Sequence, residues 1–254
     1  MNFKIVETIE MDNSSKVIIQ AFTGSGLVAS IASHQLIYQL NMIEKGYISS
    51  PLIPSLGIVR NGLIQRPIRL YENKDYILLL SEVGIPHENL NEFIENLFNW
   101  YLSMEPIAIV IIGALPTGRS ANAIDLRYKI VASDDETRLQ LESKGVNIMP
   151  QGAVYGSVAL SLLEASKYKL SSYAILPDCV ATVPDYLAAK KVLQILSITL
   201  NTKIDFSIFE TNIEELKLHL IEKENQREEN EIYEDYDSYN DFDDSEDDDL
   251  SKFI

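Results

Sequence analysis

Hydrophobic and polar residues follow strand-like and helix-like periods in alternating blocks along most of the chain. Continuous apolar runs at 75–81 and 107–114 are typical of strands that are buried on both faces of a sheet. Apolar residues recur at helical spacing over 26–44, 87–104 and 184–200. Because strands and helices alternate, the pattern predicts an α/β domain with a mostly parallel central sheet flanked by helices.

Weaker patterns complete the set of predicted elements. Further strands are predicted at 3–9, 16–22, 127–133 and 172–177, and further helices at 134–145, 154–168 and from 205 onward. Gly46 is expected to end the first helix as its C-cap. Asn61-Gly62 predicts a two-residue turn in a hairpin over 57–71, which we expect at one edge of the sheet.

The C-terminal part of the chain has a different composition. Residues 222–254 hold fifteen acidic and three basic side chains, a net charge of −12, which leaves −5 of the total −17 for residues 1–221. So polar a segment cannot bury enough surface to offset its chain entropy. We therefore predict one α/β domain over 1–221 and an acidic, disordered tail over 222–254 with an apolar tip at 250–254.

Charge and composition exclude several classes of function. A net charge of −17 argues against a nucleic-acid partner, because phosphate contacts need clustered Lys and Arg. No apolar run is long enough to span a bilayer, and the first residues lack the pattern of a signal peptide. The single cysteine, Cys179, excludes an intrachain disulfide and a cysteine-based metal cluster. We expect a cytoplasmic protein with no membrane partner.

A glycine loop, Gly24-Ser25-Gly26, joins a predicted strand to the first predicted helix. Such a loop can hold a phosphate on backbone N–H groups, or its glycines can let the helix pack closely on the sheet. The acidic ribose ligand of a dinucleotide site and the Lys-Ser/Thr of a P-loop are both missing. A nucleophile elbow would need glycine where the chain has Thr23 and Leu27. The structural interpretation is therefore favoured, with a phosphate-binding enzyme as the alternative.

Other candidate sites are weaker. His34, His87 and His219 lie on different predicted elements, so no metal site is expected. The loop at 113–125 follows a buried strand and could bind an anion or a sugar; we prefer the alternative that it is a solvated loop or a subunit contact. Its polar residues are Arg119, Asn122 and Asp125. We expect no cofactor and no catalytic residue.

Four segments together resemble the PAC2 family, the proteasome assembly chaperones. They are QAFTGSGLVASIASHQLIYQL, NGLIQRPIRLY, GAVYGSVALSLLEASKY and PDYLAAKKVLQILSITLNTKID, and the matches extend to residue 205, over nearly the whole predicted domain. The resemblance implies a fold similar to that of nucleoside phosphorylases, without established catalysis. It also implies an archaeal-type homo-oligomer, alone or with a paralogue, and a role in assembling or binding the 20S proteasome.

The resemblance further implies that the C-terminus docks between proteasome α-subunits. The family's motif is a hydrophobic residue, a tyrosine and any residue that bears the free carboxylate. Phe253 stands at the tyrosine position and Ile254 supplies the carboxylate, while Lys252 departs from the hydrophobic requirement and Leu250 lies just before it. We expect a non-enzymatic chaperone that binds α-subunits through these residues. The alternatives are a nucleoside- or phosphate-binding enzyme of phosphorylase-like fold and an acidic adaptor that binds basic proteins by charge.

Overall fold

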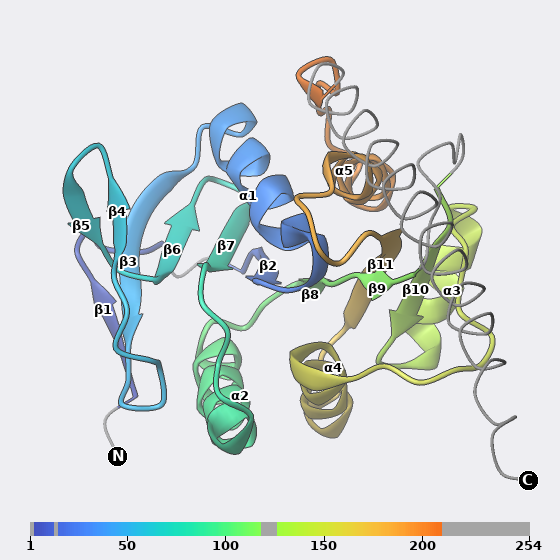
Figure 1. Cartoon of the computed structure of the whole chain (residues 1–254). Coiled ribbons are helices and arrows are strands. Elements are labelled where there is room, and N and C mark those ends of the chain that lie inside the picture. The colour runs from blue at the N-terminus through green and yellow to red at the C-terminus, as the bar shows by residue number, and fades with distance from the viewer. Residues whose placement is uncertain (1–2, 13–14, 118–125, 210–254) are drawn as a thin grey trace, which may run out of the picture.

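A nine-stranded sheet runs through the centre of the computed structural model, and helices cover both of its faces (Figure 1). The structure describes residues 3–12, 15–117 and 126–209. The predicted α/β class is confirmed by this arrangement.

The elements are as follows. The strands are β1 (Lys4–Glu7), β2 (Val17–Phe22), β3 (Ile43–Ser49), β4 (Ile58–Arg60), β5 (Leu63–Gln65), β6 (Ile68–Glu72), β7 (Tyr76–Ser81), β8 (Ala108–Ile112), β9 (Leu115–Pro116), β10 (Tyr128–Ala132) and β11 (Ser172–Cys179). The helices are η1 (Ser25–Leu27, a 3₁₀ turn), α1 (Val28–Gln39), α2 (His87–Ser103), α3 (Asp135–Ser143), α4 (Gly156–Tyr168) and α5 (Tyr186–Leu200).

The strands of the main sheet lie in the order β1-β3-β6-β7-β2-β8-β11-β10, and β9 extends the sheet beside β11. The four central strands, β7, β2, β8 and β11, are parallel, and antiparallel strands flank them on both sides. In the centre, Ile19 of β2 lies opposite Leu78 of β7 and Val110 of β8. All six residues of β7 are buried, as its continuous apolar run predicts. The predicted parallel centre is therefore confirmed.

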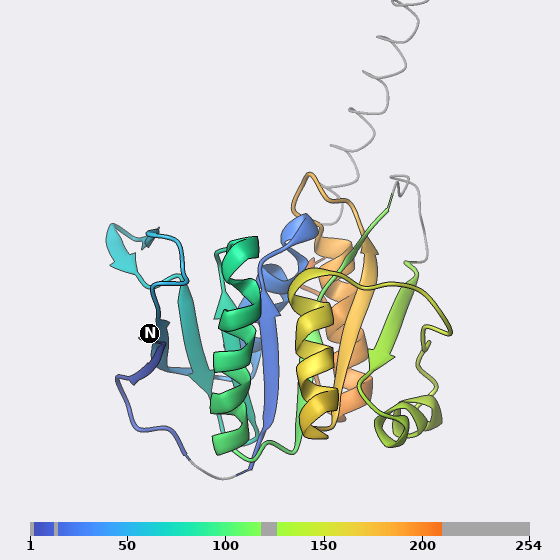
Figure 2. The same ribbon diagram turned by 90° about the horizontal axis from the view of Figure 1, so that it is seen from below.

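Each face of the sheet carries its own hydrophobic core. Helices α1 and α5 cover one face, and α2 and α4 cover the other (Figures 1 and 2). Helix α2 buries Phe93, Leu97, Phe98 and Tyr101 completely. These four residues follow helical spacing, so a single stripe of α2 faces the sheet. Burial of each aromatic ring contributes about 2 kcal/mol or more to stability.

The first helix ends earlier than the sequence analysis expects, and Gly46 is not its cap. Helix α1 stops at Gln39, and Asn41 takes a left-handed φ of 48°. The N–H of Met42 then donates to the carbonyl of Ile37 at 2.9 Å, which closes a Schellman motif. Gly46 lies instead in β3, an unpredicted strand, where a Cβ would stand 2.3 Å from the Val6 carbonyl oxygen. Gly46 therefore serves the close approach of β1 to β3.

The predicted hairpin is present, with its turn at Asn61-Gly62. These residues have φ angles of 50° and 76°, as the tight turn requires. Strands β4 and β5 form a separate two-stranded sheet, which projects beside β3 at the left of Figure 1. The chain then passes Pro67 and joins the main sheet as β6.

The described chain ends on the α1/α5 face. Helix α5 stops at Leu200, and residues 202–206 are not helical, so the helix predicted from 205 does not begin there. Phe209 is only 1% exposed and joins the core on this face. The predicted domain boundary at 221 and the tail at 222–254 lie outside the described residues.

Candidate functional site

The glycine loop connects β2 to α1, and Gly26 packs closely against the loop that precedes α5. The φ of Gly26 is 64°, a conformation that strongly favours glycine. A Cβ at this position would stand 2.8 Å from the Val180 carbonyl oxygen and 3.1 Å from the Asp185 Cβ. The Gly26 carbonyl accepts a hydrogen bond from the Asp185 N–H at 2.8 Å. The loop thus fits against a second segment with no room for a side chain.

Three consecutive backbone N–H groups, from Gly26 to Val28, already have partners in the chain. The N–H of Gly26 donates to the Ala181 carbonyl at 3.3 Å, and that of Leu27 donates to the Gly24 carbonyl at 3.1 Å. The Val28 N–H donates to the Ser25 carbonyl. A phosphate site needs such groups pointing at the ligand. The geometry therefore favours packing over phosphate binding.

Asp185 completes the contact and was not singled out from the sequence. It is fully buried, and its two carboxylate oxygens accept from the N–H groups of Ala188 at 3.0 Å and Val180 at 2.8 Å. The first bond caps α5, and the second fixes the loop that touches Gly26. An Asp that directly precedes an apolar helical pattern is the signal that would have identified it.

A cluster of charged side chains anchors the β4–β5 hairpin to the body. Glu82, just beyond β7, accepts hydrogen bonds from Arg60 of β4 and from Arg69 of β6, one on each carboxylate oxygen. Arg69 also donates to the Gln65 side chain at 2.8 Å. The side chains of Arg69 and Glu82 are 3% and 11% exposed, so their charges are largely removed from water. One carboxylate shared by two arginines makes a strong clamp, because each bond is charge-assisted.

His34 of α1 adds an uncharged member to this cluster. Its Nδ1 lies 2.7 Å from the Ser30 carbonyl oxygen and must donate, so its Nε2 accepts from Arg60 at 2.6 Å. Burial lowers the pKa of His34, and the charges of Arg60 and Arg69 lower it further, although the Ser30 carbonyl and Glu82 act in the opposite direction. The neutral ring therefore suits its place beside Arg60. From the sequence, His34 is expected to pack on its helix or lie at the surface and to bind no metal; the cluster is missed because its members are far apart in the chain.

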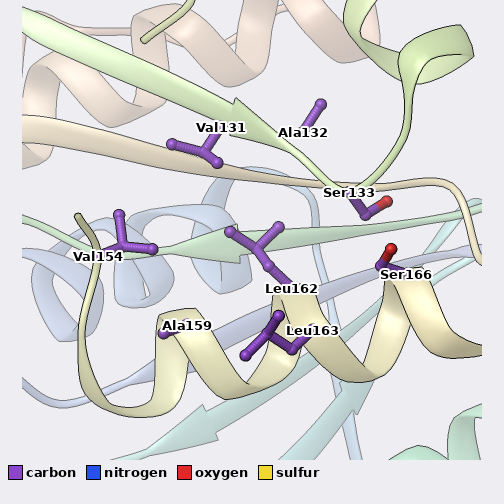
Figure 3. A pocket seen from close by; sticks show the side chains of 8 residues that line it. All are labelled: Val131, Ala132, Ser133, Val154, Ala159, Leu162, Leu163 and Ser166. Carbon is purple, nitrogen blue, oxygen red and sulfur yellow. The ribbon is translucent and has the colours of Figure 1, made fainter. Parts of the chain in front are cut away.

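An apolar groove opens between α4 and the edge strand β10. One cavity of about 370 Å³ lies between Leu162 of α4 and Val131 of β10 (Figure 3). A second cavity of about 370 Å³ lies beside Tyr155, and Val154 lines both. Leu163 and Tyr155 are 65% and 82% exposed. Apolar atoms dominate the lining, so the groove is suited to an apolar partner rather than to acid–base chemistry.

The other residues named from the sequence fall into two groups. His34 lies on α1 and His87 opens α2, and no group of metal-ligating side chains is found in the described parts of the chain. Several lie outside the described residues, namely Arg119, Asn122, Asp125, His219, Leu250, Lys252, Phe253 and Ile254.

Comparison with known proteins identifies the family. The model of the PAC2 family matches residues 18–223, which is most of the chain. The chain belongs to the PAC2 family. This assignment confirms the resemblance carried by the four sequence segments.

Individual relatives agree with the assignment. The uncharacterized protein MJ0106 of Methanocaldococcus jannaschii is 28% identical over 219 residues, which cover 85% of this chain and 90% of the relative. Pyrococcus furiosus PbaA, an archaeal homolog of proteasome-assembly chaperone, is 25% identical with a TM-score of 0.76, over 93% of this chain and 98% of PbaA. Pyrococcus furiosus PbaB, an archaeal proteasome activator, has a TM-score of 0.77 at 19% identity, over 87% of this chain and 98% of PbaB, and this likeness is one of fold.

None of the described helices combines the length and the apolar character that crossing a membrane requires.

Proposed function

We propose that this protein is a non-enzymatic proteasome assembly chaperone or proteasome-binding factor that docks on 20S α-subunits through its C-terminal tail. The observation that carries the proposal is the likeness to PbaA, which extends over nearly the whole of both chains. A cytoplasmic location and a homo-oligomeric state belong to the same proposal.

The C-terminal residues suit a docking role. The described body ends at the buried Phe209, and residues 210–254 follow it in the sequence. Its last two residues, Phe253 and Ile254, offer an aromatic ring and a terminal carboxylate after a long acidic run. Several weak tails on one oligomer would act together in binding.

The energies of one contact are modest. Burial of the Phe253 ring contributes about 2 kcal/mol, and a charge-assisted hydrogen bond to the carboxylate contributes about 1.5–3 kcal/mol. Association costs offset much of this. Truncation of the ring should therefore weaken binding roughly 30-fold for each tail.

The alternative of a phosphate- or nucleoside-binding enzyme has less support. The N–H groups of Gly26, Leu27 and Val28 are already bonded to carbonyls of the chain. A thermal-shift screen with inorganic phosphate and nucleosides tests it, and we expect no stabilisation at millimolar ligand.

The direct test is capture of 20S α-subunits by the full-length protein, by the Phe253→Ala variant and by a variant truncated after Asp249. Both altered proteins should capture much less. Phe242→Ala is the matched control, because it removes an aromatic ring from the same acidic tail but not from its end. Capture that is equally strong for all four proteins would refute docking through the tip. Equal losses for Phe242→Ala and Phe253→Ala would favour a less specific tail contact.

A further inference from the structure

The β4–β5 hairpin has an inverted polarity for an element of a folded domain. Its body-side face carries Arg60 and Gln65, which bond to Glu82 and Arg69. Cross-strand partners Val59 and Ile64 share the opposite face and are 68% and 74% exposed. Core-forming elements normally turn such residues inward.

The exposed apolar residues are therefore available for a partner. Leu63, beside the turn, is 69% exposed but lies on the face of its cross-strand partner Arg60, so the outward apolar face consists of Val59 and Ile64. An isolated two-stranded hairpin is only marginally stable in water. Here the charged clamp of Arg60, Glu82 and Arg69 holds the hairpin in place, so its apolar face is presented by a fixed support. Contiguous exposed apolar surface of this kind marks an interaction site.

The groove between α4 and β10 is the opposite kind of surface. It is concave and lined by apolar side chains, and it lies at the far end of the sheet from the hairpin (Figures 1 and 2). The α4 residues that line it follow helical spacing; they are Ala159, Leu162, Leu163 and Ser166. Helices α2 and α4 do not fully cover the face of β10 that carries Val131, and Val131 lines the open cavity there.

We propose that the β4–β5 hairpin of one copy inserts into the α4–β10 groove of a second copy, so that the protein self-associates head to tail. Ile64 and Val59 enter the cavity beside Leu162 and Leu163. The proposal rests on the proposed function, which includes a homo-oligomer, and names the two surfaces that build it. Because the two surfaces are different, an open chain of copies retains one unused hairpin at one end and one unused groove at the other until a ring closes.

Charges at the two surfaces fit this pairing. Residues 51–71, which contain the hairpin, include three arginines and no acidic residue; Arg60 and Arg69 are held by Glu82, which leaves Arg66 outside that clamp. Arg66 is exposed and lies over the Tyr47 ring at 4.8 Å. The groove ends at Ser133, and Asp134, Asp135 and Glu136 follow directly.

The acidic residues at the Ser133 end of the groove differ in how far they can reach a second copy. Asp134 accepts a hydrogen bond from Ser133 and caps α3. The Asp135 side chain is 90% exposed and forms an ion pair with Arg138 at 3.2 Å. At the other end, Lys129 precedes Val131 by two residues and lies on the same face of β10. Arg66, the exposed arginine outside the Glu82 clamp, should therefore lie at the Ser133 end, which fixes the orientation of the inserted hairpin.

Complementation between two variants tests the proposal. Ile64→Asp spoils the hairpin and Leu163→Asp spoils the groove, and both positions are exposed, so the fold should be retained. Native mass measurement should find each variant alone as a monomer, with a dissociation constant raised about 100-fold by a charge in an apolar contact. A mixture of the two should form a dimer that grows no further, because it contains one intact hairpin and one intact groove. Tyr38→Asp, at a residue 75% exposed on α1, is the matched control and should assemble as wild type.

Cysteine pairing gives a second readout. The chain has a single cysteine, the buried Cys179, so a Cys introduced at Ile64 and another at Leu163 react with little background. The double variant should form a ladder of disulfide-linked copies on oxidation, and each single variant should stop at a linked dimer or not link at all.

Several results would overturn the proposal. A monomeric wild-type protein would do so, as would variants that assemble normally or a mixture that stays monomeric. These measurements contain no proteasome, so they are separate from the capture of α-subunits. If the mass measurements contradict the proposal while α-subunits are captured normally, only the proposed interface is overturned. If the protein assembles as proposed but does not capture α-subunits, only the proposed function is overturned.

Discussion

Substitution of Gly26 by alanine tests whether the glycine loop serves packing. Alanine at a φ of 64° costs roughly 1–2 kcal/mol in backbone conformation. Its methyl group would stand 2.8 Å from the Val180 carbonyl oxygen, a backbone atom that cannot swing aside, and such crowding costs roughly 1–3 kcal/mol. The reduced entropy of the unfolded chain returns about 0.4–1 kcal/mol. We therefore expect Gly26→Ala to lower the free energy of unfolding by about 2–4 kcal/mol.

Gly24→Ala is the internal control, two residues away in the same loop. Its φ is −166°, which is extended backbone, and no heavy atom lies within 4 Å of an added Cβ. The change should alter the free energy of unfolding by less than about 1 kcal/mol. Urea denaturation of both variants and of the wild type, with equal m-values as the check on two-state unfolding, measures the difference. Equal effects of the two substitutions would refute the packing argument. Stabilisation of the wild type by phosphate that is lost in Gly26→Ala would favour a binding role instead.

Three further predictions concern the buried polar groups. Glu82→Gln removes the charge shared by two arginines and should lower the free energy of unfolding by about 2–3 kcal/mol. This loss is smaller than that expected for a fully buried pair, because Arg60 is partly exposed. As the control, Glu142→Gln breaks an exposed pair and should change the free energy of unfolding by less than about 0.5 kcal/mol. Because the pKa of His34 is lowered in the folded state, the unfolded chain takes up the proton first, and the free energy of unfolding should fall as pH drops through about 6.5. The His34→Gln variant should show a smaller fall between pH 7.5 and 5. Identical pH dependence of stability in the variant and the wild type would contradict a neutral His34 in the folded state. Tyr101→Phe leaves the buried Gln20 oxygen without its 3.2 Å donor and should cost about 1–2 kcal/mol in chemical denaturation, whereas no measurable loss would remove this bond from the account.

Local patterns were sufficient for the centre of the fold. The apolar run of β7 and the single buried stripe of α2 each report burial directly, and Asn61-Gly62 reports the turn that only such residues form easily. Gly46 was misassigned because a glycine after a helical pattern is a common stop signal, while the real stop is Asn41 in a left-handed conformation. The demand on Gly46 comes from the backbone of β1, about forty residues away along the chain, which local pattern does not reveal.

The site residues were harder to foresee because they meet across long sequence separations. The Glu82 clamp joins residues from β4, β6 and the end of β7, and His34 adds a member from α1. Each is an ordinary charged or polar residue in its own segment, so only the three-dimensional fold brings them together. The same holds for the groove, since Val131 of β10 and Leu162 of α4 become neighbours only in the folded domain.

The measurement that tests the central claim most directly is the native mass of the full-length protein alone and mixed with 20S α-subunits. The account predicts a homo-oligomer that forms a complex with α-subunits, and a complex that is lost when residues 250–254 are removed while the oligomer remains. A lone monomer whose mass is unchanged by α-subunits would contradict it.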